Sequence, residues 1–324
     1  GTVYKIDPSG NETTLVEFNA TTNGFTPTGS LLLVGNTLYG TVEGVLPSSY
    51  GAVFSVNTDG SNFQLLHLFN SNNAFEPIGP QLLAPGGKAI YGITEYGGRG
   101  AHQGSGVVYQ LNLNGAFAIL HAFKKTDGIT PDMLLMNAAG TLYGSTSSGG
   151  TNNQGTVFSL VPSTRAFATL YSFTGKKDEG IPTLGSIGPG GVLYGATYGA
   201  IFANPPQYGT LFSLTPNGST YRYTELHKFG VGGNVTYGAN PGPPQILADG
   251  GLVGSDFEGL YLYDPSVPYG GISFNPQSVV PNFEGGRAVT LFSNAVYGEA
   301  VGGNVSTQYP YGAGVIFRWS PGTQ

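Results

Sequence analysis

Four acidic side chains lie within three residues after a Tyr-Gly or Val-Gly pair, and their chemistry could support catalysis. They are Glu43, Glu95, Asp256 and Glu299. Two carboxyl groups about 5 to 9 Å apart can cleave a glycosidic bond, one as the acid and the other as base or nucleophile. The sequence does not reveal their separation, and no nucleophile-elbow motif supports a Ser-His-Asp triad. We therefore assign no catalytic residue and keep a polysaccharide lyase or hydrolase as an alternative.

Three histidines suggest a metal site at first sight, because imidazole is a common zinc ligand. His67, His121 and His227 occupy the same position of a repeated Leu-His-x-Phe pattern. Equivalent positions in different repeats lie too far apart to share one ion, so we interpret these rings as packing residues. The chain contains no cysteine, which excludes disulfides, thiolate metal ligands and thiol nucleophiles. We expect no metal and no cofactor.

Aromatic and polar side chains in long loops are the expected ligand-binding residues. The set is Tyr50, Tyr96, Arg99, His102, Tyr208, Tyr309 and Tyr311. Tyrosine rings stack on the apolar faces of sugars and offer an amphipathic surface at a low cost in conformational entropy. A carbohydrate or another surface protein fits this chemistry. The alternative is that these tyrosines only pack the long loops onto the scaffold.

An internal repeat supplies the scaffold that must position these loops. A glycine followed by a short β-rich segment occurs seven times, at intervals of 49 to 55 residues. The seven segments begin at Gly1, Gly51, Gly106, Gly155, Gly209, Gly259 and Gly314. Repeats of this length are typical of solenoids and propellers.

Three further segments accompany this glycine-led strand, which we name strand C. Strand D follows it as a Leu-x-x-Phe pattern, for example Leu66–Phe69, with Val280–Phe283 as the sixth copy. Strand A is an apolar run, and strand B ends in a Tyr-Gly pair. The tyrosines of these pairs are expected to pack between repeats, and the glycines to allow a close backbone approach. They are Tyr39, Tyr91, Tyr143, Tyr194 and Tyr297.

Short strands bounded by Gly, Pro, Asn and Asp, without a sustained helical period, indicate an all-β chain. Six copies of a four-stranded antiparallel unit predict a single β-propeller over residues 1–324, with about six repeats of ~52 residues. Residues 1–18 read as strands C and D, and the last repeat supplies strands A, B and C. The N-terminal strand D would therefore complete the last blade and close the ring. One strand C is then surplus, and seven blades are the alternative to six.

The connections between strands indicate which face carries the ligand. The A–B and C–D turns are short and rich in Gly, Asn and Asp, as tight turns require. The B–C loops share the other face with the D–A connections and are longer and more aromatic. Variable loops on a rigid scaffold commonly carry binding sites, so we expect the ligand there.

Composition restricts the partner and the location. Charged residues make up 9% of the chain, against about 25% in an average soluble protein, and the net charge is −6. Basic residues form no patch, so we expect no nucleic-acid binding. No run of eighteen apolar residues predicts a membrane span. The weakly charged, Asn-, Thr- and Tyr-rich surface favours an extracellular or cell-surface protein, whose signal peptide would have been removed.

The repeat also resembles a known family. GTVFSL at Gly155, LHAF at Leu120, the proline at Pro131 and LYGSTSSGG at Leu142 are similar to the unit of the Gloeo-Verruco tandem repeat (GloVer) proteins. The resemblance weakens in the fifth and sixth units, where Val253 and Pro281 depart from the pattern. It implies a secreted or surface-anchored bacterial protein and assigns no activity.

These observations leave three hypotheses of function. The first is a binding or adhesion module that presents its aromatic-rich loops to a carbohydrate or a surface protein. The second is a structural subunit that self-assembles into a surface layer or filament. The third is the polysaccharide-acting enzyme, and it would require an acid–base pair close together in the loop face.

Overall fold

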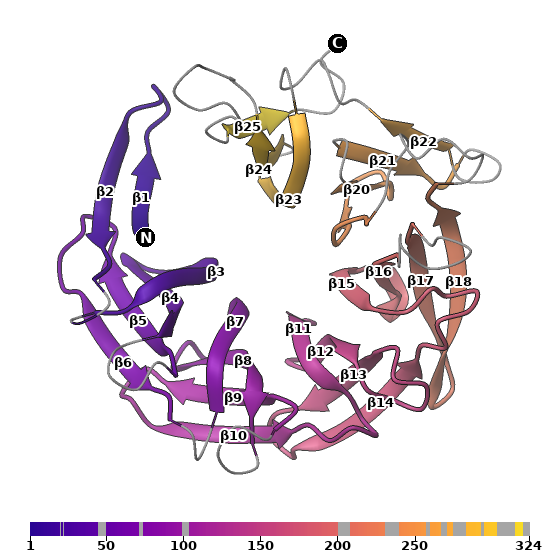
Figure 1. The fold of residues 1–324 in the computed structure, drawn as a ribbon, viewed down its shortest axis with the longest axis horizontal. Helices are drawn as coiled ribbons and strands as arrows, with labels where there is room; N and C mark the ends of the chain where they lie inside the picture. Colours follow the sequence, from indigo (N-terminus) through magenta and orange to yellow (C-terminus); the bar gives the residue numbers. More distant parts are fainter. Residues whose placement is uncertain are drawn as a thin grey trace. The chain divides into compact units, whose positions relative to one another are not determined.

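The structure is a computed structural model that describes residues 1–19, 21, 23–44, 50–70, 74–98, 104–199, 208–230, 240–256, 260–266, 271–274, 283–292, 295–302 and 315–319. It divides into two compact units, Gly1–Thr169 and Leu170–Gln324, and each is described by itself. Both units are built from antiparallel β-sheets (Figure 1). The predicted all-β class is therefore confirmed.

The first unit contains a two-stranded sheet, β1–β2, and the four-stranded sheets β3–β6, β7–β10 and β11–β14, each in sequence order. Its strands are β1 (Thr2–Ile6), β2 (Glu12–Glu17), β3 (Phe25–Val34), β4 (Thr37–Gly44), β5 (Ala52–Asn57), β6 (Gln64–Leu68), β7 (Ala74–Leu83), β8 (Ala89–Gly97), β9 (Val107–Asn112), β10 (Phe117–Ala122), β11 (Ile129–Met136), β12 (Leu142–Ser148), β13 (Thr156–Val161) and β14 (Ala166–Ser172). The division between the units falls within β14.

The second unit contains the sheets β15–β18, β19–β22 and β23–β25, again in sequence order. Its strands are β15 (Pro182–Ile187), β16 (Leu193–Thr197), β17 (Thr210–Asn217), β18 (Thr220–Lys228), β19 (Gln245–Ile246), β20 (Leu252–Ser255), β21 (Leu260–Asp264), β22 (Gly271–Phe274), β23 (Phe283–Phe292), β24 (Ala295–Gly302) and β25 (Val315–Trp319). Within the described ranges the single helix is the 3₁₀ turn η1 (Pro189–Gly191).

Each four-stranded sheet follows the predicted order A, B, C, D. The first strands of neighbouring sheets, such as β3 and β7, contact one another (Figure 1). This contact requires glycine, because a Cβ on Gly29 would lie 2.3 Å from the carbonyl oxygen of Gly79. One predicted strand is wrong. In the sheet β19–β22, the fourth strand is β22. Phe283, which the sequence pattern placed in a strand D, instead begins β23.

The chain ends carry partial sheets. β1 and β2 pair as a hairpin in which Thr2 faces Glu17 and Val3 faces Val16. The same register joins strands C and D of the first four-stranded sheet, where Ala52 faces Leu68. β23, β24 and β25 correspond to strands A, B and C. The predicted strand types at both ends are thus confirmed.

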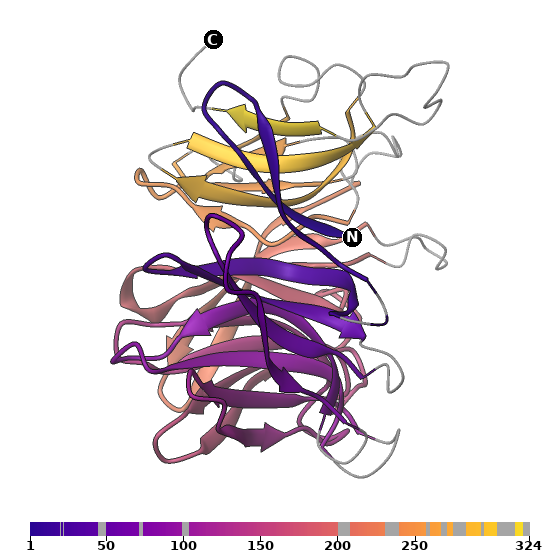
Figure 2. The ribbon, with the colours of Figure 1, turned by 90° about the vertical axis from the view of Figure 1, so that its left-hand side faces the viewer.

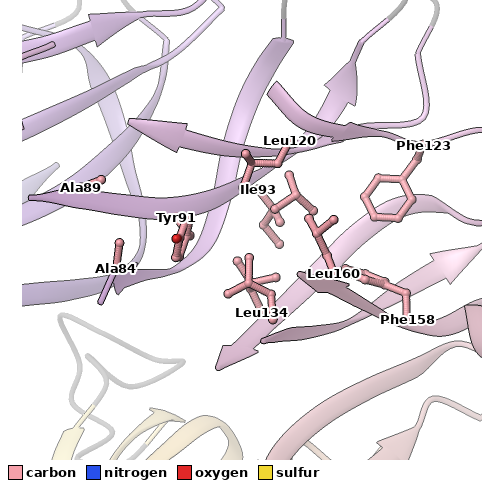
Figure 3. Close-up of a cluster of buried hydrophobic side chains, with 11 residues drawn as sticks. Ala84, Ala89, Tyr91, Ile93, Leu120, Phe123, Leu134, Phe158 and Leu160 are labelled. Carbon is pink, nitrogen blue, oxygen red and sulfur yellow. The ribbon is translucent and has the colours of Figure 1, made fainter. Parts of the chain in front are cut away.

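The cores lie between facing sheets of a unit, which Figure 2 shows as successive layers in the first unit. Figure 3 shows one such core, which contains Tyr91 and Ile93 of β8, Leu134 of β11 and Phe158 of β13. All four side chains are buried. Tyr91 belongs to a Tyr-Gly pair, and its place in this core supports the predicted packing role for that tyrosine.

In five of the Tyr-Gly or Val-Gly pairs, the glycine covers a buried ring of the neighbouring strand C. A Cβ on that glycine would approach the ring within 2.3 to 2.5 Å, which is closer than any stable contact. The five pairs are Gly40 over Phe54, Gly92 over Tyr109, Gly144 over Phe158, Gly195 over Phe212 and Gly254 over Tyr261. The expected close approach therefore exists, and its partner is an aromatic ring.

The histidines pack in an aromatic series along the fourth strands. His67 stacks on Phe117 at 4.1 Å and 5°, and His121 stacks on Phe167 at 3.7 Å and 3°. Tyr171 occupies the equivalent position in the next repeat. Burial lowers the pKa of His67, His121 and His227, although Asp127, whose Oδ2 lies 3.4 Å from Nε2 of His121, opposes this effect there. The rings therefore act as packing groups.

The described part of the chain contains no helix with the length and hydrophobicity needed to cross a membrane.

We expect Gly40→Ala to lower the free energy of unfolding by about 1–3 kcal/mol, the usual cost of overpacking a core. The added methyl group would lie 2.5 Å from Cζ of Phe54 and 2.8 Å from Cδ2 of Leu31. A Phe54→Leu change in the same chain should cost less than it does alone, because the smaller side chain relieves the clash. Chemical denaturation of the two single variants and the double variant measures this coupling. Strictly additive costs would contradict the contact.

The free energy of unfolding should fall as the pH drops below about 6.5, the ordinary pKa of histidine, because the unfolded chain then binds protons that the buried rings do not. His67→Phe keeps a ring over Phe117 and removes the titrating group, so it should flatten this decrease between pH 7 and pH 5. His67→Leu should flatten it equally and also lower stability at pH 7, because the stacked ring is lost. Denaturation curves at both pH values test this, and an unchanged slope in both variants would contradict it.

Candidate functional site

Two predicted ligand-binding tyrosines meet around one phenylalanine in the first unit. Tyr50 lies two residues before the start of β5, Phe75 lies near the start of β7, and Tyr96 lies near the end of β8. Phe75 and Tyr96 face each other in the β7–β8 pair, and their rings stack at 5.3 Å and 19°. The ring of Tyr50 meets Phe75 edge-on at 6.0 Å and 66°. Phe75 is buried, whereas both tyrosines are partly exposed.

Backbone contacts between two sheets hold these residues together. The N–H of Glu76 donates a hydrogen bond of 3.1 Å to the carbonyl oxygen of Tyr50. The next residue, Gly51, has a φ of +91°, and a Cβ there would lie 2.4 Å from Cδ of Pro77. Only glycine combines this backbone conformation with such close packing. The repeated glycine and proline therefore position the tyrosine ring.

The same backbone link occurs at two further places, and at one of them the acceptor residue is not a tyrosine. In the next pair of sheets, Thr130 N–H donates to the carbonyl oxygen of Ser105 at 3.0 Å. In the second unit, Asn240 N–H donates to the carbonyl oxygen of Tyr208 at 2.8 Å. Because serine serves equally well, the backbone link does not require the aromatic ring of Tyr50. The backbone link therefore leaves the choice of side chain at this position open.

Three carboxylates accompany the rings. Glu43 lies at the end of β4, Glu76 follows Phe75, and Glu95 precedes Tyr96. Burial raises the pKa of Glu76, and the charges of Glu95 and Glu43 raise it further. All three side chains are partly exposed. We call the six residues Tyr50, Phe75, Tyr96, Glu43, Glu76 and Glu95 the aromatic–carboxylate patch.

The Tyr96 hydroxyl interacts with two of these carboxylates. A hydrogen bond to the Glu95 carboxylate, burial, and the charges of Glu95 and Glu76 raise the pKa of Tyr96 to about 12. The phenol therefore stays protonated at neutral pH and acts as a donor. Thr94 fixes the strand end by donating through Oγ1 to the carbonyl oxygen of Tyr96 at 2.8 Å. The patch thus combines oriented ring faces with hydrogen-bonding oxygen atoms.

This arrangement suits recognition of a ligand that has apolar faces and hydroxyl groups. Partly exposed rings can stack on such faces, and carboxylates and a phenol can exchange hydrogen bonds with hydroxyls. No group of three or more His, Asp or Glu side chains suited to a metal ion occurs in the described ranges.

The other predicted ligand-binding residues are not among the six residues of the aromatic–carboxylate patch. Tyr208, in the second unit, packs against the core formed by Leu211, Phe229, Leu252 and Tyr261. A Cβ on Gly230 would lie 2.2 Å from its ring. These contacts give Tyr208 a packing role. Arg99, His102, Tyr309 and Tyr311 lie outside the described residues.

The four acidic residues that the sequence analysis considered for catalysis lie in different units of the structure. Glu43 and Glu95 act on the same carboxylate, Glu76. Asp256 belongs to the second unit and is 2% exposed, so it is buried in the fold. Glu299 lies in β24, also in the second unit, and its side chain is outside the described part.

Sequence reasoning missed Phe75 and Glu76. Both precede the repeat proline at the start of a strand A, where the pattern indicated only a connection. The start of a strand A must lie opposite the end of its strand B in an antiparallel hairpin. Phe75 faces Tyr96 for this reason. The same rule, applied to the sequence, would have identified Phe75 as a neighbour of Tyr96.

A second acidic pair in the chain, Asp178 and Glu179, is structural. Asp178 accepts hydrogen bonds from Tyr171 Oη, from the Thr174 N–H and from Thr174 Oγ1. Glu179 pairs with Lys228 Nζ at 2.6 Å and accepts the Gly209 N–H at 2.7 Å. These partners come from the protein itself.

Known structures share this fold at low sequence identity. A puromycin-hydrolyzing peptidase from Mycobacterium tuberculosis is 13% identical, with a TM-score of 0.63 over 99% of this chain and 48% of its own. An extracellular domain assigned to a one-component system of B. thetaiotaomicron is 12% identical, with a TM-score of 0.59 over 98% of this chain and 38% of its own. A luciferin-regenerating enzyme is 12% identical, with a TM-score of 0.53 over 93% and 92%.

These likenesses concern the fold alone, which is propeller-like in the similar structures. The chain spans about half of the peptidase and less of the extracellular domain. No match occurs among curated protein sequences.

A sequence profile described as the Gloeobacter/Verrucomicrobia repeat matches residues 1–205. The match ends before the fifth and sixth units, where Val253 and Pro281 depart from the repeat pattern. The first four glycine-led segments, the first four Leu-x-x-Phe segments and the first four Tyr-Gly pairs lie within the matched region. The chain belongs to the Gloeobacter/Verrucomicrobia repeat family.

Proposed function

We propose that the chain is an extracellular carbohydrate-binding module whose ligand contacts the aromatic–carboxylate patch. The observation that carries the proposal is the meeting of two partly exposed tyrosines, Tyr50 and Tyr96, around the buried ring of Phe75. A supported ring keeps its orientation, so little conformational entropy is lost when a sugar stacks on it.

Location outside the cell, secreted or bound at the surface, is part of this proposal. One similar structure is an extracellular domain, and the weakly charged, Asn-, Thr- and Tyr-rich chain agrees with this location. A surface protein is the alternative ligand. Arg99 and His102 follow Tyr96 closely in the sequence, and Tyr309 and Tyr311 come between β24 and β25 in the sequence. These four residues remain proposed ligand contacts. Tyr208 is proposed with less direct support, because its ring packs inward.

A polysaccharide-acting enzyme is the second candidate, and one observation favours it. Glu76 has a raised pKa beside two other carboxylates, as a general acid next to an ionised partner would. Release of reducing ends from polysaccharides, lost in Glu76→Gln, would identify such an enzyme. Self-assembly into a surface layer or filament is the third candidate, and it would show as ligand-independent growth in particle size.

We further propose that the sheets form one closed propeller over residues 1–324. Six blades require β2 to pair with β25, the strand C of the last sheet. β2 instead pairs with β1 in the register typical of strands C and D. This pairing supports the seven-bladed alternative, in which β1–β2 and β23–β25 occupy separate blade positions.

Binding to arrayed oligosaccharides and polysaccharides tests the proposed function. Tyr50→Ala and Tyr96→Ala should each weaken retention by about 10-fold or more, since a lost aromatic stack costs on the order of 1–3 kcal/mol by analogy with base stacking. Tyr4→Ala is the matched control, because Tyr4 is an exposed tyrosine of β1 outside the patch. It should bind as the wild type does.

Retention lost equally in all three variants would indicate a general loss of folding, which circular dichroism reveals. Absence of retention for every glycan would overturn the carbohydrate proposal and favour the protein-binding or self-assembling alternatives.

Cysteine pairs test the closure, because the chain has no cysteine of its own. Thr2 and Glu17 face each other in β1–β2, so Thr2→Cys with Glu17→Cys should form a disulfide under mild oxidation. In a six-bladed ring, the repeat alignment places Val315 opposite Glu17 instead. We expect the Glu17→Cys, Val315→Cys pair to stay reduced, and its oxidation in the monomer would establish six blades.

A further inference from the structure

We infer that the aromatic–carboxylate patch selects uncharged saccharides and disfavours saccharides that carry carboxylate or sulfate groups. This inference rests on the proposed function and names the ligand class of the same site. It concerns the sign of the charge that a ligand meets beside Tyr50 and Tyr96.

The charges of the patch all have one sign. Glu43 and Glu95 are the charged groups that act on Glu76, and Glu95 and Glu76 are those that act on Tyr96. Each is a carboxylate. An anion stacked on Tyr96 would therefore approach two negative groups that already repel each other.

No described basic side chain of the first unit is among the charges that shift the pKa of Glu76 or Tyr96. Lys5 donates through Nζ to the carbonyl oxygen of Thr58, beyond the end of β5 opposite to Tyr50. Lys88 precedes β8, whereas Tyr96 lies near the other end of that strand. Arg165 precedes β14, and the charge of Lys124 acts on His121. Lys125 is next to Lys124 in the loop after β10.

The expected discrimination is large enough to measure. Before screening by salt, two like charges about 8 Å apart near a protein surface repel each other by an energy equivalent to about 30-fold in affinity. Salt reduces the effect, since the Debye length is about 8 Å at physiological ionic strength. With two or three carboxylates, we expect at least a tenfold preference for the neutral form of a sugar at low salt.

Matched sugar pairs provide the test. Cello-, manno- and galacto-oligosaccharides are compared with their uronate forms, in which each C6 hydroxymethyl group is oxidised to a carboxylate. The ratio of the two dissociation constants is measured by titration calorimetry at 20 mM and 500 mM NaCl. The neutral sugar should bind at least tenfold more tightly at low salt, and the ratio should shrink at high salt.

Charge-removal variants connect the ratio to the patch. Glu43→Gln with Glu76→Gln should reduce the ratio to about threefold or less, and Glu95 is kept because it bonds Tyr96. Glu12→Gln with Glu17→Gln removes equal charge from β2 in the same unit and should leave the ratio unchanged. Arg99→Gln shows whether this neighbouring cation, outside the described residues, offsets the carboxylates.

The outcomes separate the two proposals. Uronates that bind as tightly as neutral sugars, and depend on Tyr50 and Tyr96, would overturn the selectivity and leave the proposed function intact. An unchanged ratio in the Glu43→Gln, Glu76→Gln variant would also overturn it. No binding by either sugar class would overturn both.

Discussion

The contact between a strand-B glycine and a strand-C ring is the constraint on which each sheet depends. Gly144 lies against Phe158, and Gly40 lies against Phe54, so closely that no side chain fits between them. The ring fills the volume that the glycine leaves open, and tight filling of this kind is what makes a protein interior dense. With the ring held there, the neighbouring Tyr-Gly tyrosine, such as Tyr91, can pack into the core between two sheets.

Close packing against a glycine also positions the candidate site. Gly51 lets the start of β5 approach Pro77 of the next sheet, and the Glu76 N–H then reaches the carbonyl oxygen of Tyr50. This scaffold repeats along the chain, but its side chains differ from one copy to the next. Ser105 and Tyr50 make the same backbone bond with different chemistry at their tips. Function can therefore vary at the loops without disturbing the sheets.

Burial decides what the titratable side chains do. The histidines lose water on stacking, which lowers their pKa and keeps them neutral as packing rings. Glu76 also loses water, but its neighbours are carboxylates that stay partly exposed, and its pKa rises. The first environment is a core between rings, and the second is a surface where a ligand can enter.

The sequence by itself determined the strand types and their order, because glycine spacing, Leu-x-x-Phe segments and tight-turn residues are local signals. It also predicted Tyr50 and Tyr96 as ligand-binding residues. Only the tertiary structure decided that these two share Phe75, that Glu76 joins Glu43 and Glu95, and that Tyr208 packs inward. These relations join residues of different sheets or opposite strand ends. The misplaced strand at Phe283 has the same cause, since pairing partners rather than local pattern determine which sheet a segment joins.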